Sequence, residues 1–79
     1  MNKKPLFIRA EWDEDANVWV ATSDDIPGLA TEEQTIEGLI KKLKIIVPEL
    51  LEANGQEVES EVPFEIFTRR FEIAQKVAV

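Results

Sequence analysis

Carboxylates are the side chains in this sequence that could best carry out chemistry, and four of them lie near one another along the chain. Asp24 and Asp25 are adjacent, and Glu11 and Asp13 precede them. Nucleases that use magnesium gather several carboxylates around the metal. A simpler interpretation gives each acid a local role, in which Asp25 caps the turn at residues 26–28 and Asp24 is solvated. We favour the simpler interpretation, and predict no catalytic, cofactor-binding or metal-binding residue.

The rest of the composition narrows the chemistry further. The chain has 79 residues and contains no His, Cys or Tyr. Zinc sites built from His or Cys, disulfides, thiol nucleophiles and histidine relays are therefore excluded. Only carboxylates, lysines and hydroxyls remain for acid–base work. We therefore expect a protein that is not an enzyme and that needs no cofactor.

The charge balance bears on the class of partner. The chain has 16 acidic and 9 basic residues, a formal net charge of -7. Nucleic-acid affinity depends on clustered basic residues, so we expect no direct nucleic-acid binding. An acidic surface favours a basic protein partner, with solubility alone as the alternative. Lys41, Lys42 and Lys44 lack neighbouring aromatics for base stacking and are interpreted as a solvated helix face. Arg69 and Arg70 are interpreted as protection of a sheet edge.

The length and the hydropathy of the chain bear on where the protein resides and on whether it associates with itself. No window approaches the ~20 consecutive apolar residues of a membrane span, and no apolar stretch of a signal peptide follows the first lysines. We expect one domain over residues 1–79, in the cytoplasm and without membrane contact. A chain this short buries little surface by itself. Without disulfides or a metal site, oligomerisation is a common source of stability, so we expect a homodimer or a higher homo-oligomer.

Strand patterns occupy the first part of the chain. Residues 6–12 alternate between apolar and polar, residues 13–17 favour a turn, and residues 18–22 are rich in β-branched and aromatic types. These segments predict an antiparallel hairpin. Pro27 and Gly28 form a strong turn signal, after which residues 29–31 can form a short third strand.

A long amphipathic helix is the clearest element. Apolar residues recur with a period of about 3.6 residues and predict a helix from Thr35 to Asn54. Thr35 is the expected N-cap, with Thr31 and Gln34 as a competing capping box. Pro48 removes one helical hydrogen bond, but the apolar period continues past it in phase. We therefore predict a kink there and not a stop.

A fourth strand is predicted at residues 62–70, where Pro63 indicates a strand start or a sheet edge. Residues 71–79 could extend that strand, form a short helix or fray. The order β-β-β-α-β predicts a two-layer α+β domain with a mostly antiparallel sheet. The helix can cover only one face of the sheet. Phe7 and Phe67 remain on the other face, and exposed apolar surface of this kind usually binds a partner.

The candidate partner interface combines these aromatics with the tryptophans and the acidic loop. It consists of Phe7, Trp12, Trp19, Asp24, Asp25, Ile26 and Phe67. Tryptophan is frequent at binding hot spots, but it is also a large core residue. We favour core or homodimer packing for Trp12 and Trp19. One of the two has an even and the other an odd residue number, which argues against their facing each other directly across the hairpin.

Several of these motifs resemble the HicB-like antitoxin superfamily. They are the hairpin at residues 8–21, the Asp-Ile-Pro-Gly loop at residues 25–28 and the Thr-Ile-Glu helix start at residues 35–37. The runs at residues 19–29 and 48–55 resemble a small family of unknown function within that superfamily.

The resemblance implies a partial RNase H-like fold of order β-β-β-α-β. It also implies binding and masking of HicA, a small basic ribonuclease that uses a histidine. Typical HicB proteins carry a C-terminal DNA-binding segment, for which residues 71–79 are too short, so we expect none here. The leading hypothesis is a non-enzymatic protein-interaction domain resembling the HicB antitoxin. The alternatives are an orphan homodimeric structural or ligand-sensing domain and, more remotely, a metal-dependent nuclease.

Overall fold

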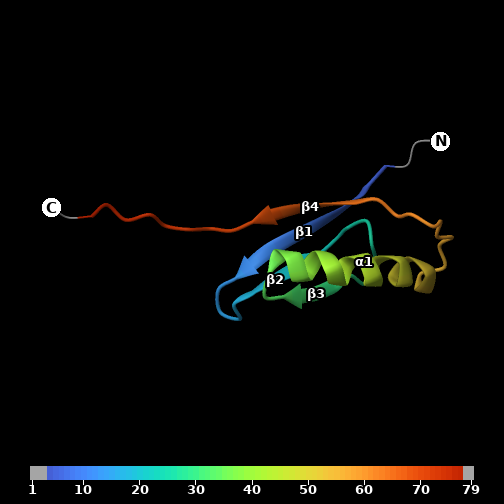
Figure 1. Ribbon diagram of the computed structural model, residues 1–79, viewed down its shortest axis with the longest axis horizontal. Helices are drawn as coiled ribbons and strands as arrows, with labels where there is room; N and C mark the ends of the chain where they lie inside the picture. Colours follow the sequence, from blue (N-terminus) through green and yellow to red (C-terminus); the bar gives the residue numbers. More distant parts are fainter. Residues whose placement is uncertain (1–3, 78–79) are drawn as a thin grey trace.

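The computed structural model describes residues 4–77 and consists of one sheet and one helix in two layers (Figure 1). The elements, in chain order, are β1 (Leu6–Asp13), β2 (Val18–Thr22), β3 (Ala30–Glu33), α1 (Ile36–Ala53) and β4 (Phe64–Arg69). This is the predicted α+β arrangement of order β-β-β-α-β. The sheet order is β3-β2-β1-β4, so β3 and β4 are the two edge strands.

The strand pairing is mixed. β2 pairs antiparallel with both β1 and β3, whereas β4 pairs parallel to β1. The predicted hairpin turn is present because Asp13 Oδ1 accepts hydrogen bonds from the amides of Asp15 (3.0 Å) and Ala16 (3.2 Å). Asn17 closes the turn with a φ of 57°, a left-handed conformation that Asn tolerates.

The two ends of α1 are set by hydrogen bonds of its capping residues, Thr35 and Asn54. Thr35 Oγ1 accepts a hydrogen bond from the Gly38 amide at 3.0 Å, so the expected N-cap is confirmed and the capping box at Thr31 is wrong. The helix continues through Pro48 without a stop, as predicted. It ends at Asn54, whose amide bonds to the Leu50 carbonyl at 2.9 Å.

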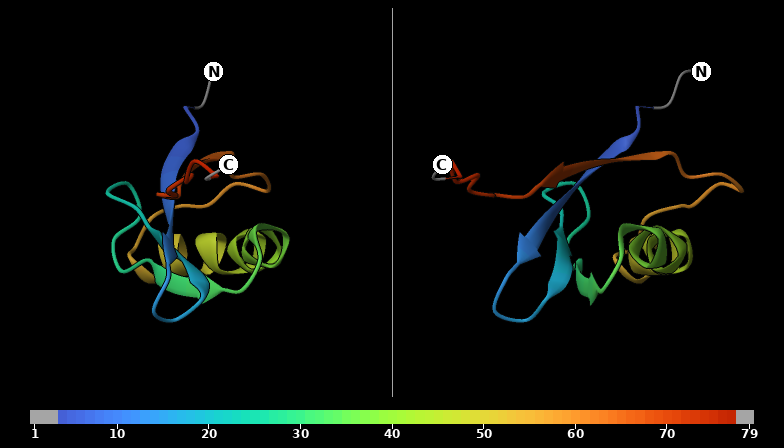
Figure 2. Two further views of the ribbon diagram at one scale, coloured as in Figure 1. Left: turned by 90° about the vertical axis from the view of Figure 1, so that its left-hand side faces the viewer. Right: turned by 60° about the vertical axis from the view of Figure 1, so that its left-hand side comes forward.

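α1 lies over one face of the sheet (Figure 2), and the core residues come from the helix and from the strands beneath it. The buried residues of the core come from both layers and from the loop before β3. They are Ile8, Ala10, Ala21, Ile26, Leu29, Leu39, Leu43, Val47 and Leu51. The helix supplies four of the nine, Leu39, Leu43, Val47 and Leu51, at the spacing that places them on one stripe.

Two strands differ from their predicted bounds for local reasons. Leu29 was expected in the third strand, but its side chain is buried in the core and its amide bonds to the Ile26 carbonyl at 3.1 Å, so β3 begins only at Ala30. β4 begins after Pro63, which has no N–H to donate and instead accepts from the Leu6 amide at 3.0 Å.

The segment after β4 forms neither of the regular structures considered for it. Residues 70–77 are assigned to no helix or strand, and all are exposed. They run away from the two layers in an extended path (Figure 1), and the molecule measures 60 × 26 × 19 Å. Residues 78–79 lie outside the described part of the chain. Among residues 4–77, no helix has the length and apolar character needed to cross a membrane.

Candidate protein-interaction surface

The side of the sheet opposite α1, which we call the open face, is formed by alternate residues of the strands. On β1, Ile8 and Ala10 are buried beneath the helix, whereas Phe7, Arg9 and Glu11 are exposed on the other side. Successive strand side chains point to opposite faces. The register therefore adds Val20, Thr22, Glu65, Phe67 and Arg69 to the open face.

Two phenylalanines form the aromatic part of the open face. The ring centroids of Phe7 and Phe67 lie 5.5 Å apart with an interplanar angle of 65°, an edge-to-face contact. Phe7 is 52% exposed and Phe67 is 54% exposed. The prediction that this face retains exposed aromatics is therefore confirmed. An aromatic pair that is half solvated on a sheet face is typical of a contact surface.

The acidic loop is fastened to β1 beside this pair. Asp25 Oδ2 accepts a hydrogen bond from the Phe7 amide at 2.9 Å, and the Ser23 hydroxyl donates to the Phe7 carbonyl. The Asp25 amide in turn donates to Ser23 Oγ at 3.0 Å. β2 ends at Thr22, opposite Arg9, so no strand pairs with the part of β1 that precedes Arg9 on that side. The side chains of Ser23 and Asp25 bind the carbonyl and the amide of Phe7 in its place.

This arrangement corrects the role expected for Asp25. Its carboxylate binds β1, and the turn at residues 26–28 is closed by the hydrogen bond from the Leu29 amide to the Ile26 carbonyl. No pattern in the sequence indicated the part that Ser23 plays. The neighbouring Asp24 is solvated, as expected, with its side chain 89% exposed.

Charged pairs border the phenylalanines on two sides. Asp24 pairs with Arg9 at 3.1 Å, and Glu11 pairs with Arg69 at 3.6 Å. Exposed ion pairs contribute little to stability, so their main effect is to place charge at fixed positions. A shallow hollow of about 170 Å³ opens between the loop and β1, lined by Phe7, Arg9, Ser23, Asp24 and Asp25.

The four carboxylates considered as a metal cluster have separate partners. Glu11 pairs with Arg69, Asp13 binds turn amides, Asp24 pairs with Arg9, and Asp25 binds the Phe7 amide. In the described residues 4–77, no group of three or more acidic side chains is arranged to hold a metal ion.

The tryptophans face each other, contrary to the prediction from parity. Trp12 and Trp19 are direct partners in the β1–β2 register, with ring centroids 5.4 Å apart. In an antiparallel hairpin, the residue numbers of every facing pair add up to the same value. That value is odd when the loop between the strands has an even number of residues, as it has here. Opposite parity is therefore what direct partners across this hairpin require.

Both tryptophans lie on the helix side of the sheet and are only partly buried. Trp19 packs against the core, and the Arg70 guanidinium lies 4.3 Å from the ring centroid of Trp12. Arg70 thus covers an aromatic ring, a role that its position in the sequence did not indicate. The tryptophan pair is separate from the open face, so the predicted interface residues divide into two groups.

Two further predictions are settled by burial and contacts. Ile26 is 0% exposed, so it belongs to the core and is withdrawn from the interface. It was misplaced because the loop folds back and inserts this side chain beneath α1. Lys41 and Lys44 are exposed, as predicted for a solvated helix face. Lys42 differs, because its Nζ donates to the Glu32 carbonyl of β3 at 3.3 Å and lies 3.5 Å from Glu33 Oε2.

The whole described domain, including the open face, matches a known family. Residues 5–77 match the family described as "Domain of unknown function (DUF1902)". The chain belongs to this family. Among solved structures, the crystal structure of a hypothetical protein, TTHA1013 from the extremely thermophilic bacterium Thermus thermophilus, is similar to this chain. The two are 46% identical, and the match covers 92% of this chain and 100% of that one with a TM-score of 0.69. No curated protein matches the sequence.

Proposed function

We propose that this DUF1902 protein is a non-enzymatic interaction domain of the HicB type, which binds and masks a small basic HicA-like ribonuclease in the cytoplasm. The observation that carries the proposal is the open face, where Phe7 and Phe67 are half exposed within a border of charged side chains. The net charge of -7 supports a basic partner.

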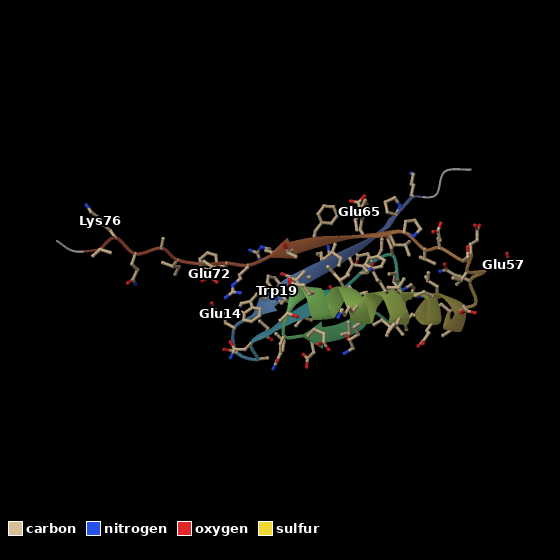
Figure 3. All side chains as sticks on the ribbon, viewed as in Figure 1. Glu14, Trp19, Glu57, Glu65, Glu72 and Lys76 are labelled. Atoms are coloured by element: carbon tan, nitrogen blue, oxygen red, sulfur yellow. The ribbon has the colours of Figure 1, made fainter. Side chains whose placement is uncertain are left out.

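The chemistry of the open face suits a protein better than a small molecule. Binding energy in protein interfaces is concentrated in a few aromatic anchors, with polar residues around them. The Phe7–Phe67 pair supplies such an anchor. Glu65 projects from β4 away from α1 (Figure 3), and the Asp24 carboxylate stands at the border of the same face. The hollow beside them, about 170 Å³, is small for a ligand site.

The sequence motifs support a HicA-like ribonuclease as the partner. The resemblance to HicB-like antitoxins includes the Asp-Ile-Pro-Gly loop, and that loop is the one fastened to Phe7 beside the aromatic pair. A masked ribonuclease must have a basic surface for its RNA substrate. An acidic face with an apolar centre would compete for that surface.

Affinity purification from native cells, with mass spectrometry of the co-eluting proteins, tests the proposal first. We expect a small basic protein at near-equal stoichiometry. The purified pair is then compared by calorimetry with two variants, Phe67→Ser on the open face and Ile45→Ser on α1. Ile45 is a matched control because it is 64% exposed.

We expect Phe67→Ser to weaken binding at least about tenfold, the loss of roughly 1.4 kcal/mol, and Ile45→Ser to leave it unchanged. Binding should also weaken as salt is raised, because charge attraction is screened. Recovery of no small basic protein, or equal affinities for the two variants, would count against the proposal.

An orphan homodimer with a structural or ligand-sensing role is the second candidate. The exposed apolar side chains after β4 favour self-association, since Phe71, Ile73 and Val77 are each more than 70% exposed. Recovery of the protein only with itself in the same purification would favour this candidate. Self-association is compatible with the first function, and we propose a homodimer in either case.

A further inference from the structure

The segment of residues 70–77, which we call the tail, has the pattern of a strand without a partner. Phe71, Ile73 and Val77 share one parity with Phe67, and they are 71%, 72% and 81% exposed. Glu72 and Lys76 have the other parity. Figure 3 places Lys76 far along the tail, away from the two layers, and Glu72 near the end of β4, where it pairs with Arg70. Ala74 and Gln75 interrupt the alternation, but the three large apolar side chains of the tail all share one parity, and period-two placement of this kind is typical of a strand with one buried face.

The tail does not have the sequence needed to fold back on its own sheet. A return along the free edge of its own β4 requires a tight turn, and turns depend on Gly, Pro, Asn or Asp. Residues 69–77 contain none of the four. Its own β1 offers little further pairing, because only Trp12 and Asp13 lie beyond the last pair, Glu11 with Arg69, and residues 72–77 extend past the end of β1.

A free edge of suitable length exists on β4 itself. β4 is at the end of the sheet order and pairs with β1 on one side only, among the residues described. It has six residues and the tail has eight, counted from 70 to 77. At ~3.3 Å per residue the tail, at roughly 26 Å, spans the roughly 20 Å of β4.

The tail differs in charge from the rest of the chain. Residues 70–77 carry two basic and one acidic side chain, a net +1, whereas the whole chain carries a net charge of -7. The tail is thus the basic segment of an acidic protein. In the antiparallel register that places Ile73 beside Phe67 of another copy, Lys76 lies opposite Phe64 at the start of that copy's β4. The charge attraction between the tail and the other copy therefore comes from their opposite net charges and not from one pair of facing side chains.

We propose that the tail adds as an antiparallel strand to the free edge of β4 in a second copy, and that the second copy's tail does the same in return. The exchange is symmetric, so one twofold axis closes it as a dimer. That axis keeps the open faces of both copies on the same side of a continuous sheet. Ile73 of one copy then lies beside Phe67 of the other. This inference rests on the homodimer proposed above and names the segment that forms it.

Light scattering after size-exclusion chromatography tests the exchange on the full chain. The expected mass is twice 9.0 kDa. The variant Phe71→Ser/Ile73→Ser should have a mass of 9.0 kDa, whereas Ile45→Ser on α1 should remain a dimer. Circular dichroism checks that all three proteins are folded. A monomeric wild type would overturn both the homodimer and the exchange. A dimer that persists in the tail variant would overturn the exchange alone.

Introduced cysteines test where the tail binds, because the natural chain has none. Chains carrying Glu65→Cys are mixed with chains carrying Ile73→Cys, Gln75→Cys or Val77→Cys, and are then oxidised. A disulfide requires Cα atoms within about 7 Å. We expect at least one of these mixtures to give a crosslinked heterodimer, and a Lys44→Cys control on α1 to give none. A stable dimer without any of the three crosslinks would overturn the pairing with β4.

Discussion

The two faces of the sheet differ in a way that the size of their side chains does not explain. On the helix side, Ile8 and Ala10 are 0% exposed, whereas on the open face the larger Phe7 and Phe67 are more than half exposed. Burial in this domain depends on whether a second layer covers the residue. One helix covers one face, and the aromatic side chains of the other face stay exposed.

The loop before β3 connects the two faces. Its Ile26 and Leu29 are buried on the helix side, while Asp24 and Asp25 bind Arg9 and the Phe7 amide. The same short segment therefore contributes to the core and sets the charged border of the open face. The following variants test whether side chains on the helix side of the sheet contribute more to the free energy of unfolding than those on the open face.

The largest effect is expected for Leu43→Ala on the covered side. Leu43 is 0% exposed at the centre of the helix stripe, and deletion of a buried leucine leaves a cavity. The free energy of unfolding should fall by about 2–5 kcal/mol. The control Ile45→Ala, two residues away and exposed, should change it by less than about 0.5 kcal/mol. Denaturant unfolding at one fixed protein concentration measures both, and similar losses would contradict the comparison.

A smaller effect is expected at Thr35, the N-cap of α1. Thr35→Ala removes the oxygen that accepts from the Gly38 amide and should cost about 1 kcal/mol. Thr35→Ser keeps the hydroxyl and should cost much less. The same unfolding experiment distinguishes them, and equal losses would show that the methyl group of Thr35 matters and the cap does not.

On the open face, Asp25→Ala should cost about 0.5–1.5 kcal/mol because it leaves the Phe7 amide without its acceptor. Asp24→Ala removes only an exposed ion pair and should cost less. Amide hydrogen exchange gives a local measurement, in which protection at Phe7 should fall in Asp25→Ala alone. Unchanged protection would show that the loop does not hold β1.

The smallest effect is expected at the end of β4. Arg70→Ala removes the guanidinium above Trp12 and should cost about 0.5 kcal/mol. It should also change the tryptophan emission spectrum, because the environment of that ring becomes more solvated. Arg69→Ala, whose side chain pairs with Glu11, is the control and should leave the emission unchanged. Identical spectra for all three proteins would contradict the contact.

Local sequence determined the elements and most of their bounds. The alternation at residues 6–12, the turn residues that follow and the apolar period of the helix each depend on neighbours within a few positions. Thr35 was identified as the N-cap because its hydroxyl acts three residues away. Phe7 and Phe67 were assigned to the open face because strand parity follows from the backbone alone.

Only the tertiary structure determined which residues that are far apart in the sequence contact each other. The pairing of Asp25 with the Phe7 amide, the burial of Ile26 and the placement of Arg70 over Trp12 each join segments through the folded sheet. The parallel pairing of β4 with β1 is of the same kind, and it directs the tail away from the two layers. Periodicity assigns a residue to a face, whereas its contacts on that face depend on register and on the path of the loops.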